Sequence, residues 1–97
     1  MAYLLIVRKK AEIHLADAYD WYDSRRTGLG SEFILSVEAV FSVIQNNPEL
    51  FSQKFRNVRI ALTPRFPYGV FYFIDRNKVI ITGVFHLSRN PAHWKSF

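Results

Sequence analysis

Hydrophobic and polar positions alternate with a helical period in the first half of the chain. Between residues 11 and 22, apolar side chains recur at i, i+4, i+7, i+8 and i+11, and the same spacing returns between residues 33 and 44. This spacing places them on one face of an α-helix. Gly28 is available for a left-handed cap between the two segments, and Pro48 stops the second one. The pattern predicts two helices joined by a short link.

A period of two replaces the helical period in the second half. In residues 57–62 the large apolar side chains Val58, Ile60 and Leu62 alternate with Asn57, Arg59 and Ala61, as in a half-buried strand. Two apolar runs follow at 68–74 and 79–85, and the turn-forming residues 75–78 join them. This part of the chain therefore predicts three strands, the last two forming a hairpin.

The remaining segments complete the predicted order. Residues 3–7 are continuously apolar, which predicts a strand covered on both faces, and residues 49–54 are expected to form a loop. The order β-α-α-β-β-β predicts an α+β fold, in which a helical hairpin packs on a mainly antiparallel four-stranded sheet. The length of the chain indicates one domain over residues 1–97.

Strand parity predicts which side chains share a face of this sheet. We expect three residues of the first C-terminal strand to face the helices: Val58, Ile60 and Leu62. On the last strand we expect the same of Val79, Ile81 and Phe85. Arg59 and His86, with Val84, then lie on the face that the helices leave open. An apolar patch left uncovered on that face indicates a binding surface, unless the segment after Leu87 folds back over it.

The charge of the chain is uneven and positive. Thirteen Lys and Arg oppose eight Asp and Glu, a formal net charge of +5, and after Glu49 the only acidic residue is Asp75. Such a field favours nucleic acid or an acidic protein as partner. The sequence has no cysteine, and His86 and His93 lack a metal-ligand spacing, so we expect no metal and no cofactor. No apolar run is long enough for a membrane span, and we expect a cytoplasmic protein.

Candidate chemistry gathers near the C-terminus. His86 could act as a general acid or base, and Arg59 and Arg65 could hold a phosphate. The competing interpretation is that Arg59 and Arg89 pair with carboxylates or carbonyls and that Trp94 covers the core. His14, on the polar side of the first helix, is expected to be solvated.

These features together resemble the RelE/ParE superfamily of toxins from type II toxin–antitoxin systems, often called plasmid-stabilisation proteins. The helical hairpin contributes Ala11 to Trp21-Tyr22, Gly28 to Phe33, and Asn47-Pro48-Glu49. The sheet and tail contribute Val58-Arg59, Arg65-Phe66-Pro67-Tyr68 with Tyr72, and His86-x-x-Arg89-x-Pro91-x-x-Trp94. The family fold is the β-α-α-β-β-β arrangement predicted above from periodicity.

The resemblance implies a toxin that inhibits growth until an antitoxin neutralises it. The antitoxin is expected to be acidic and partly disordered, and operator DNA is expected to be reached only through the toxin–antitoxin complex. The expected antitoxin contacts are Trp21, Tyr22, Phe71 and Phe73. The expected target contacts are Arg59, Arg65, Tyr68, His86, Arg89 and Trp94.

The family divides by target, and the sequence leaves three functions open. RelE-like members cut mRNA on the ribosome; a catalytic set of that kind would be Arg59, Arg65 and His86, but Leu87 stands where a tyrosine is expected. ParE-like members are reported to poison DNA gyrase, which is not an enzymatic activity. The F-P-Y corner and the closing R-x-P-x-x-W favour the ParE-like function. The third alternative is an inactive member that binds only its antitoxin.

Overall fold

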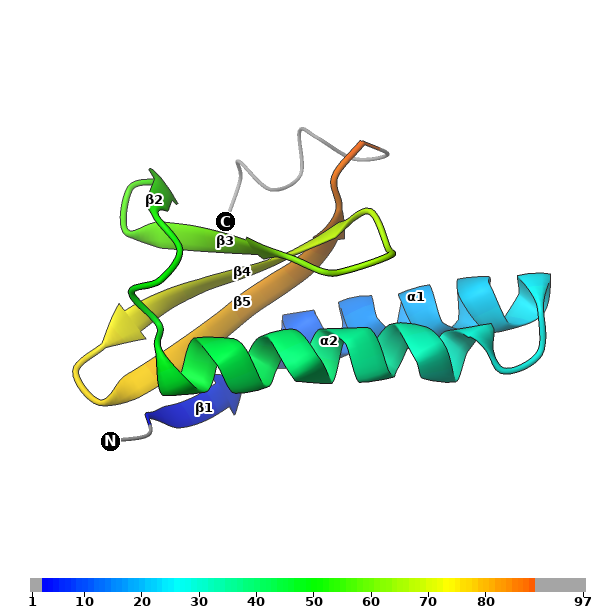
Figure 1. Ribbon diagram of the computed structural model, residues 1–97, viewed down its shortest axis with the longest axis horizontal. Helices are drawn as coiled ribbons and strands as arrows, with labels where there is room; N and C mark the ends of the chain where they lie inside the picture. Colours follow the sequence, from blue (N-terminus) through cyan, green and yellow to red (C-terminus); the bar gives the residue numbers. More distant parts are fainter. Residues whose placement is uncertain (1–2, 89–97) are drawn as a thin grey trace.

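A computed structural model describes residues 3–88 of the chain. The elements are β1 (Leu4–Val7), α1 (Lys9–Arg25), α2 (Leu29–Asn46), β2 (Gln53–Phe55), β3 (Val58–Leu62), β4 (Tyr68–Asp75) and β5 (Lys78–His86). The strands form one sheet in the order β1-β5-β4-β3-β2, with β1 parallel to β5 and the other neighbours antiparallel. Both helices lie side by side against the sheet (Figure 1). Neither helix is long and apolar enough to cross a membrane within the part of the chain that the structure describes.

The predicted α+β arrangement is confirmed, with one more strand than expected. The segment expected to be a loop contains β2, which pairs with β3 at the edge of the five-stranded sheet. Its three residues are too few to show a period, so the pairing defines the strand. The prediction that the first strand is covered on both faces is wrong. β1 is an edge strand in which Leu5 and Val7 reach the core, whereas Leu4 is 56% exposed.

The link between the helices is short because Asp23 organises it. Gly28 adopts the expected left-handed φ, 92°, but it is the N-cap of α2 and not the cap that ends α1, which is Arg26 in an extended conformation. The amides of Gly28 and Gly30 both donate to Asp23 Oδ1, at 2.9 and 3.2 Å. These are amides that an α-helix leaves unpaired at its start, so the carboxylate caps α2. Gly30 also packs against α1, since a Cβ there would lie 2.7 Å from the Tyr19 carbonyl oxygen.

The main core lies between the helices and one face of the sheet. The helices contribute Ala11, Ala18, Tyr22, Phe33, Val37, Val40 and Ile44, and the sheet contributes Ala61, Val70, Tyr72, Val79, Ile81 and Val84. A second cluster of buried side chains, Val58, Phe71 and Phe85, lies apart from it with Ile60 and Leu87 packed alongside. These residues occupy the other face of the sheet, so both faces are apolar.

The predicted parity of β3 is wrong. Ala61 is fully buried in the core beneath the helices, whereas Ile60 packs with the second cluster and Leu62 is 63% exposed. A period of two separates the two faces of a strand without saying which one is covered. Here the small side chain of Ala61 faces α2, and the larger apolar side chains face away.

The predicted parity of β5 is right for its first half and wrong for its second. Phe71 pairs with Gly83 and Tyr72 pairs with Ile81, so Thr82 is an extra residue without a partner on β4. Such a bulge reverses the facing of every later side chain. Val84 consequently packs in the main core and Phe85 in the second cluster, the reverse of the expectation. His86, opposite Tyr68, lies on the side of the helices.

Candidate functional site

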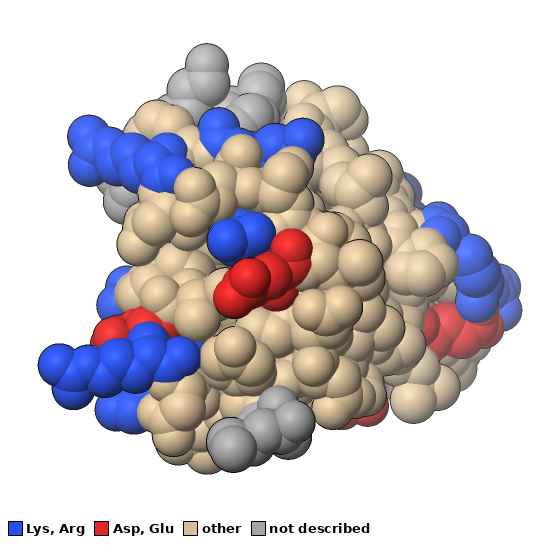
Figure 2. All heavy atoms as spheres, turned by 60° about the vertical axis from the view of Figure 1, so that its left-hand side comes forward, with Lys and Arg blue, Asp and Glu red and all other residues tan. Residues whose placement is uncertain are grey.

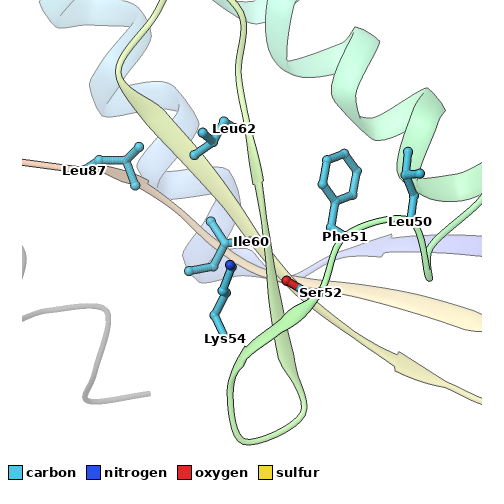
Figure 3. A pocket seen from close by; sticks show the side chains of 7 residues that line it. All are labelled: Leu50, Phe51, Ser52, Lys54, Ile60, Leu62 and Leu87. Atoms are coloured by element: carbon cyan, nitrogen blue, oxygen red, sulfur yellow. The ribbon is translucent and has the colours of Figure 1, made fainter.

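An apolar groove runs along the far side of β3. It forms a cavity of about 700 Å³ lined by Leu50, Phe51, Ser52, Lys54, Ile60, Leu62 and Leu87. Figure 3 shows Leu87 at one end, Leu50 at the other, and the β3 side chains Ile60 and Leu62 between them. A smaller hollow of about 200 Å³ shares Phe51 and Leu62 and extends the groove to α2 through Ala39, Val40, Val43 and Pro64.

The groove is apolar because it combines three segments that each leave hydrophobic side chains in solvent. Leu50 and Leu62 are 59% and 63% exposed, and Val43 on α2 is 44% exposed. Contiguous exposed apolar surface of this kind marks binding sites in soluble proteins. These residues were not predicted from the sequence, because Leu50 and Phe51 lie in a segment expected to be a loop and Leu62 was expected to face the helices. The sequence signal that could have identified the groove is the presence of two adjacent large apolar side chains, Leu50 and Phe51, in a predicted loop.

Two polar contacts, one buried and one partly buried, hold the loop that forms one wall of the groove. Tyr72 donates its hydroxyl hydrogen to the Pro48 carbonyl oxygen at 2.7 Å, and Arg59 Nη1 donates to the Phe51 carbonyl oxygen at 2.5 Å. Arg59 and Tyr72 are directly opposite each other on β3 and β4. Burial raises the pKa of Tyr72 to about 12, and the nearby charge of Arg59 offsets part of this rise. Both side chains therefore hold the backbone of this loop in place.

A tight corner connects β3 to β4 and is tied to α2. Thr63 Oγ1 contacts the carbonyl oxygens of Phe66 and Tyr68 at 2.8 and 3.1 Å, and Ser36 Oγ donates to the Pro64 carbonyl oxygen at 2.8 Å. Arg65 adopts a left-handed φ of 71°. These contacts fix the F-P-Y segment in place between the sheet and the second helix.

The carboxylate of Glu32 on α2 binds Arg65, a side chain of this corner. It pairs with Arg65 at 2.7 Å and with Arg26 at 3.2 Å. The hydrogen bond from Arg65 is the main cause that holds the pKa of Glu32 below its ordinary value; desolvation opposes it, and the charge of Arg26 adds to the lowering. Arg65 thus has a carboxylate partner. The competing interpretation concerned Arg59 and Arg89, and it is Arg59, bound to the Phe51 carbonyl, that agrees with it.

The expected catalytic residues do not converge. His86 lies opposite Tyr68, with the rings 5.3 Å apart and nearly perpendicular, and its Nδ1 accepts a hydrogen bond from the Ser88 amide at 3.2 Å. Arg59 lies opposite Tyr72, four residues along β4 and on the other neighbouring strand. At about 3.3 Å per residue and 4.8 Å per strand, the two α-carbons are roughly 16 Å apart. They share a face, as expected, but it is the face toward the helices.

The expected contact residues differ in accessibility. Trp21 is 39% exposed beneath the guanidinium of Arg25, and Phe73 is half-buried with Arg8 over its ring. Tyr22 and Phe71 are 8% and 1% exposed and belong to the two cores. Arg89 and Trp94 lie outside the described residues.

The expectation that His14 is solvated is wrong. It is half-buried, its ring lies 4.5 Å from that of Phe85, and its Nδ1 accepts the Val84 amide hydrogen at 3.2 Å. β1 pairs with β5 only as far as Ile81, so the Val84 amide lies on the edge beyond β1. The imidazole accepts the hydrogen bond that a neighbouring strand would otherwise accept, so His14 has a structural role there.

Comparisons with known proteins identify the family. None of the curated proteins matches the chain. Among solved structures, a chain described as the chromosomal ParDE TA system from P. aeruginosa superposes with a TM-score of 0.78 at 15% sequence identity, covering 88% of this chain and 96% of that chain. At this identity the likeness shows the fold. The family described as the ParE toxin of the type II toxin-antitoxin system parDE matches residues 5–91. This chain therefore belongs to the ParE toxin family of type II toxin–antitoxin systems.

Proposed function

We propose that this chain, when free of its antitoxin, inhibits growth by binding DNA gyrase and performs no bond chemistry of its own. The observation that carries the proposal is the arrangement of the three candidate catalytic residues. Arg59 holds a loop carbonyl, Arg65 pairs with Glu32, and the His86 ring lies against that of Tyr68. Each of these side chains thus has a contact within the fold.

Ribonuclease chemistry needs a different arrangement. One group must activate the 2′-hydroxyl, another must hold the phosphate, and a third must protonate the leaving oxygen, all within hydrogen-bond reach of one phosphodiester. Arg59 and His86 lie on the two strands that flank β4, roughly 16 Å apart at their α-carbons, and the Arg59 guanidinium already binds the Phe51 carbonyl, so the two groups are not preassembled around one phosphodiester. The geometry therefore favours a toxin that acts by binding a protein.

We further propose that the antitoxin occupies the apolar groove. The groove offers exposed Leu50 and Leu62 with the cation of Lys54 at its side. An antitoxin segment with apolar side chains on one face and carboxylates beside them complements this surface. Trp21 and Phe73 remain predicted contacts at other places on the fold.

Expression without the antitoxin tests the target. Cells should stop dividing and accumulate gyrase cleavage complexes, while mapped mRNA 5′ ends stay unchanged. His86→Gln, which retains a polar side chain, should arrest growth as well as the parent chain. Arrest accompanied by new mRNA 5′ ends, and lost in a folded His86→Gln protein, would establish the ribonuclease instead. No arrest by the soluble parent chain would identify an inactive member.

A matched pair of surface variants tests the groove. Leu62→Glu places a carboxylate in the groove, and Leu35→Glu places one on a part of α2 outside its lining. Both side chains are more than 60% exposed, so neither change should unfold the protein. We expect Leu62→Glu to weaken antitoxin binding at least tenfold in calorimetry and Leu35→Glu to leave it within twofold. Equal effects of the two variants would place the antitoxin elsewhere.

A further inference from the structure

Two hairpin loops with the same sequence lie at one end of the sheet. Arg56-Asn57 joins β2 to β3, between the paired residues Phe55 and Val58, and Arg76-Asn77 joins β4 to β5, between Asp75 and Lys78. In both loops the arginine adopts a left-handed φ, 55° at Arg56 and 58° at Arg76. Both loops are at the left of Figure 1, at the opposite end of the sheet from His86.

The register of β3 and β4 places the two loops at the same level. Arg59 pairs with Tyr72 in an antiparallel ladder, so continuing the register sets Arg56 against Asp75, one residue before Arg76. The hairpins are neighbours in the strand order, and their loops are therefore about two strand spacings, or roughly 10 Å, apart. Phosphates along one strand of a duplex recur every few ångströms, so a single duplex can contact both loops.

This end of the sheet is strongly basic. Lys54, Arg56, Arg76 and Lys78 give four positive charges, and Asp75 gives one negative charge, a net of +3 on the two hairpin ends. Within residues 3–88 both ion pairs are made by Glu32, so these four cations have no carboxylate partner there. Figure 2 turns this end toward the reader and shows Lys and Arg side chains projecting from the surface.

The side chains of this end favour nucleic acid over a protein partner. None of residues 54–58 and 74–78 is a large apolar side chain with high exposure, and the exposed Leu4 lies at the β1 edge, paired with Lys78, and not between the loops. A protein interface normally has an apolar centre, whereas a phosphate backbone is held by charge alone. The left-handed arginines indicate a role for the cations themselves, because an L-residue there costs about 1–2 kcal/mol relative to glycine. A long cation is thus kept at both tips where glycine would relax the backbone.

We propose that Arg56 and Arg76, supported by Lys78, form a contact surface for the phosphate backbone of double-stranded nucleic acid. It goes beyond the proposed binding of gyrase and antitoxin, and Arg56, Arg76 and Lys78 do not line the apolar groove, although Lys54 borders both surfaces. In a complex with antitoxin, the toxin itself then adds contacts to DNA. This revises the expectation that DNA is reached only through the antitoxin.

The test uses the full-length chain and a fluorescein-labelled 20-base-pair DNA duplex of mixed sequence, followed by fluorescence anisotropy from 50 to 200 mM KCl. The test variant is Arg56→Gly/Arg76→Gly, which removes two cations and relieves two strained positions. The control is Lys9→Gln/Lys10→Gln, which removes the same charge from exposed positions at the start of α1. Thermal unfolding of all three proteins is measured by circular dichroism.

The glycine variant should bind DNA roughly tenfold or more weakly at 100 mM KCl, and the slope of log K against log salt should fall by about 2. It should also melt at a higher temperature than the parent chain. Weaker DNA binding by this variant would then reflect the loss of phosphate contacts and not unfolding of the protein. The control should retain its affinity within twofold to threefold. An unlabelled RNA duplex that competes equally would extend the same phosphate chemistry to RNA and support the proposal.

Three outcomes would overturn the proposal. One is an absence of salt-dependent DNA binding by the parent chain. Another is an equal loss of DNA affinity in the glycine and glutamine variants, which would mean that the affinity depends only on the net charge of the protein. The third is displacement of the duplex by poly-L-glutamate at equal charge concentration, which would point to an acidic protein segment as the partner. None of these outcomes depends on whether gyrase is the target.

Discussion

Replacing Tyr72 with phenylalanine removes one hydroxyl group from the core and leaves the ring in place. The side chain is fully buried, and its hydroxyl donates to the carbonyl of Pro48, which is itself buried. Loss of the hydrogen bond leaves that carbonyl without this donor, which costs about 1–2 kcal/mol of unfolding free energy. For a domain of this size the melting temperature should fall by roughly 4–16 °C.

The difference between the two proteins should depend on pH in a defined direction. Burial raises the pKa of Tyr72 from 10.0 to about 12, so the folded state favours the neutral phenol more than the unfolded state does. The stability that this contributes is fully present below pH 10 and is lost as the pH rises from 10 toward 12, at about 1.4 kcal/mol per unit. The advantage of tyrosine over phenylalanine should therefore vanish near pH 11.

Urea unfolding at pH 8, 10 and 11, followed by circular dichroism, measures this difference directly. Other groups that titrate in this range are common to both proteins and cancel in the comparison. Tyr19→Phe, at a ring that is 36% exposed, serves as the control and should change stability by less than about 0.5 kcal/mol. A stability difference between the parent chain and the Tyr72→Phe variant that stays constant from pH 8 to pH 11 would refute the prediction that the folded state keeps the Tyr72 phenol neutral.

Three further predictions concern the links between elements. Gly30→Ala should destabilise the protein by about 1–3 kcal/mol in urea unfolding, because its Cβ would lie 2.7 Å from the Tyr19 carbonyl oxygen; an effect as small as that of exposed Ser31→Ala would contradict the close contact. Arg76→Gly should be about 1 kcal/mol more stable than Arg76→Ala, since only glycine relieves the φ of 58°, and equal midpoints would argue against strain. Glu32→Gln should lower the melting temperature at pH 6, and the difference should shrink as the pH falls below 4.5. The pKa of Glu32 lies below 4.5 chiefly through Arg65, so its contribution is present above that value and is lost progressively as the pH falls through the pKa of the folded state; a difference that does not shrink on acidification would exclude the carboxylate as its source.

Local patterns in the sequence were sufficient for the elements of the fold. The helical period in residues 11–22 and 33–44, the stop at Pro48 and the turn at 75–78 all correspond to elements of the structure. They could be predicted because each depends on residues within one or two turns or on one hairpin. β2 could not be predicted, because its three residues carry no period and depend on their partner strand.

The candidate site depended on tertiary structure. Alternation along β3 distinguished its two faces, but only the packing of α2 over Ala61 decided which face was covered. The bulge at Thr82 reversed His86 and Phe85 relative to the start of their strand. The sequence predicted that Arg59 could bind a phosphate, but in the folded chain its guanidinium donates to the Phe51 carbonyl oxygen. The sequence by itself determined which segments are helical or extended, because that follows from the period of neighbouring side chains. Which side chains meet, and which stay open to a partner, was decided by the packed structure, because one extra residue or one covering helix changes the facing of an entire strand.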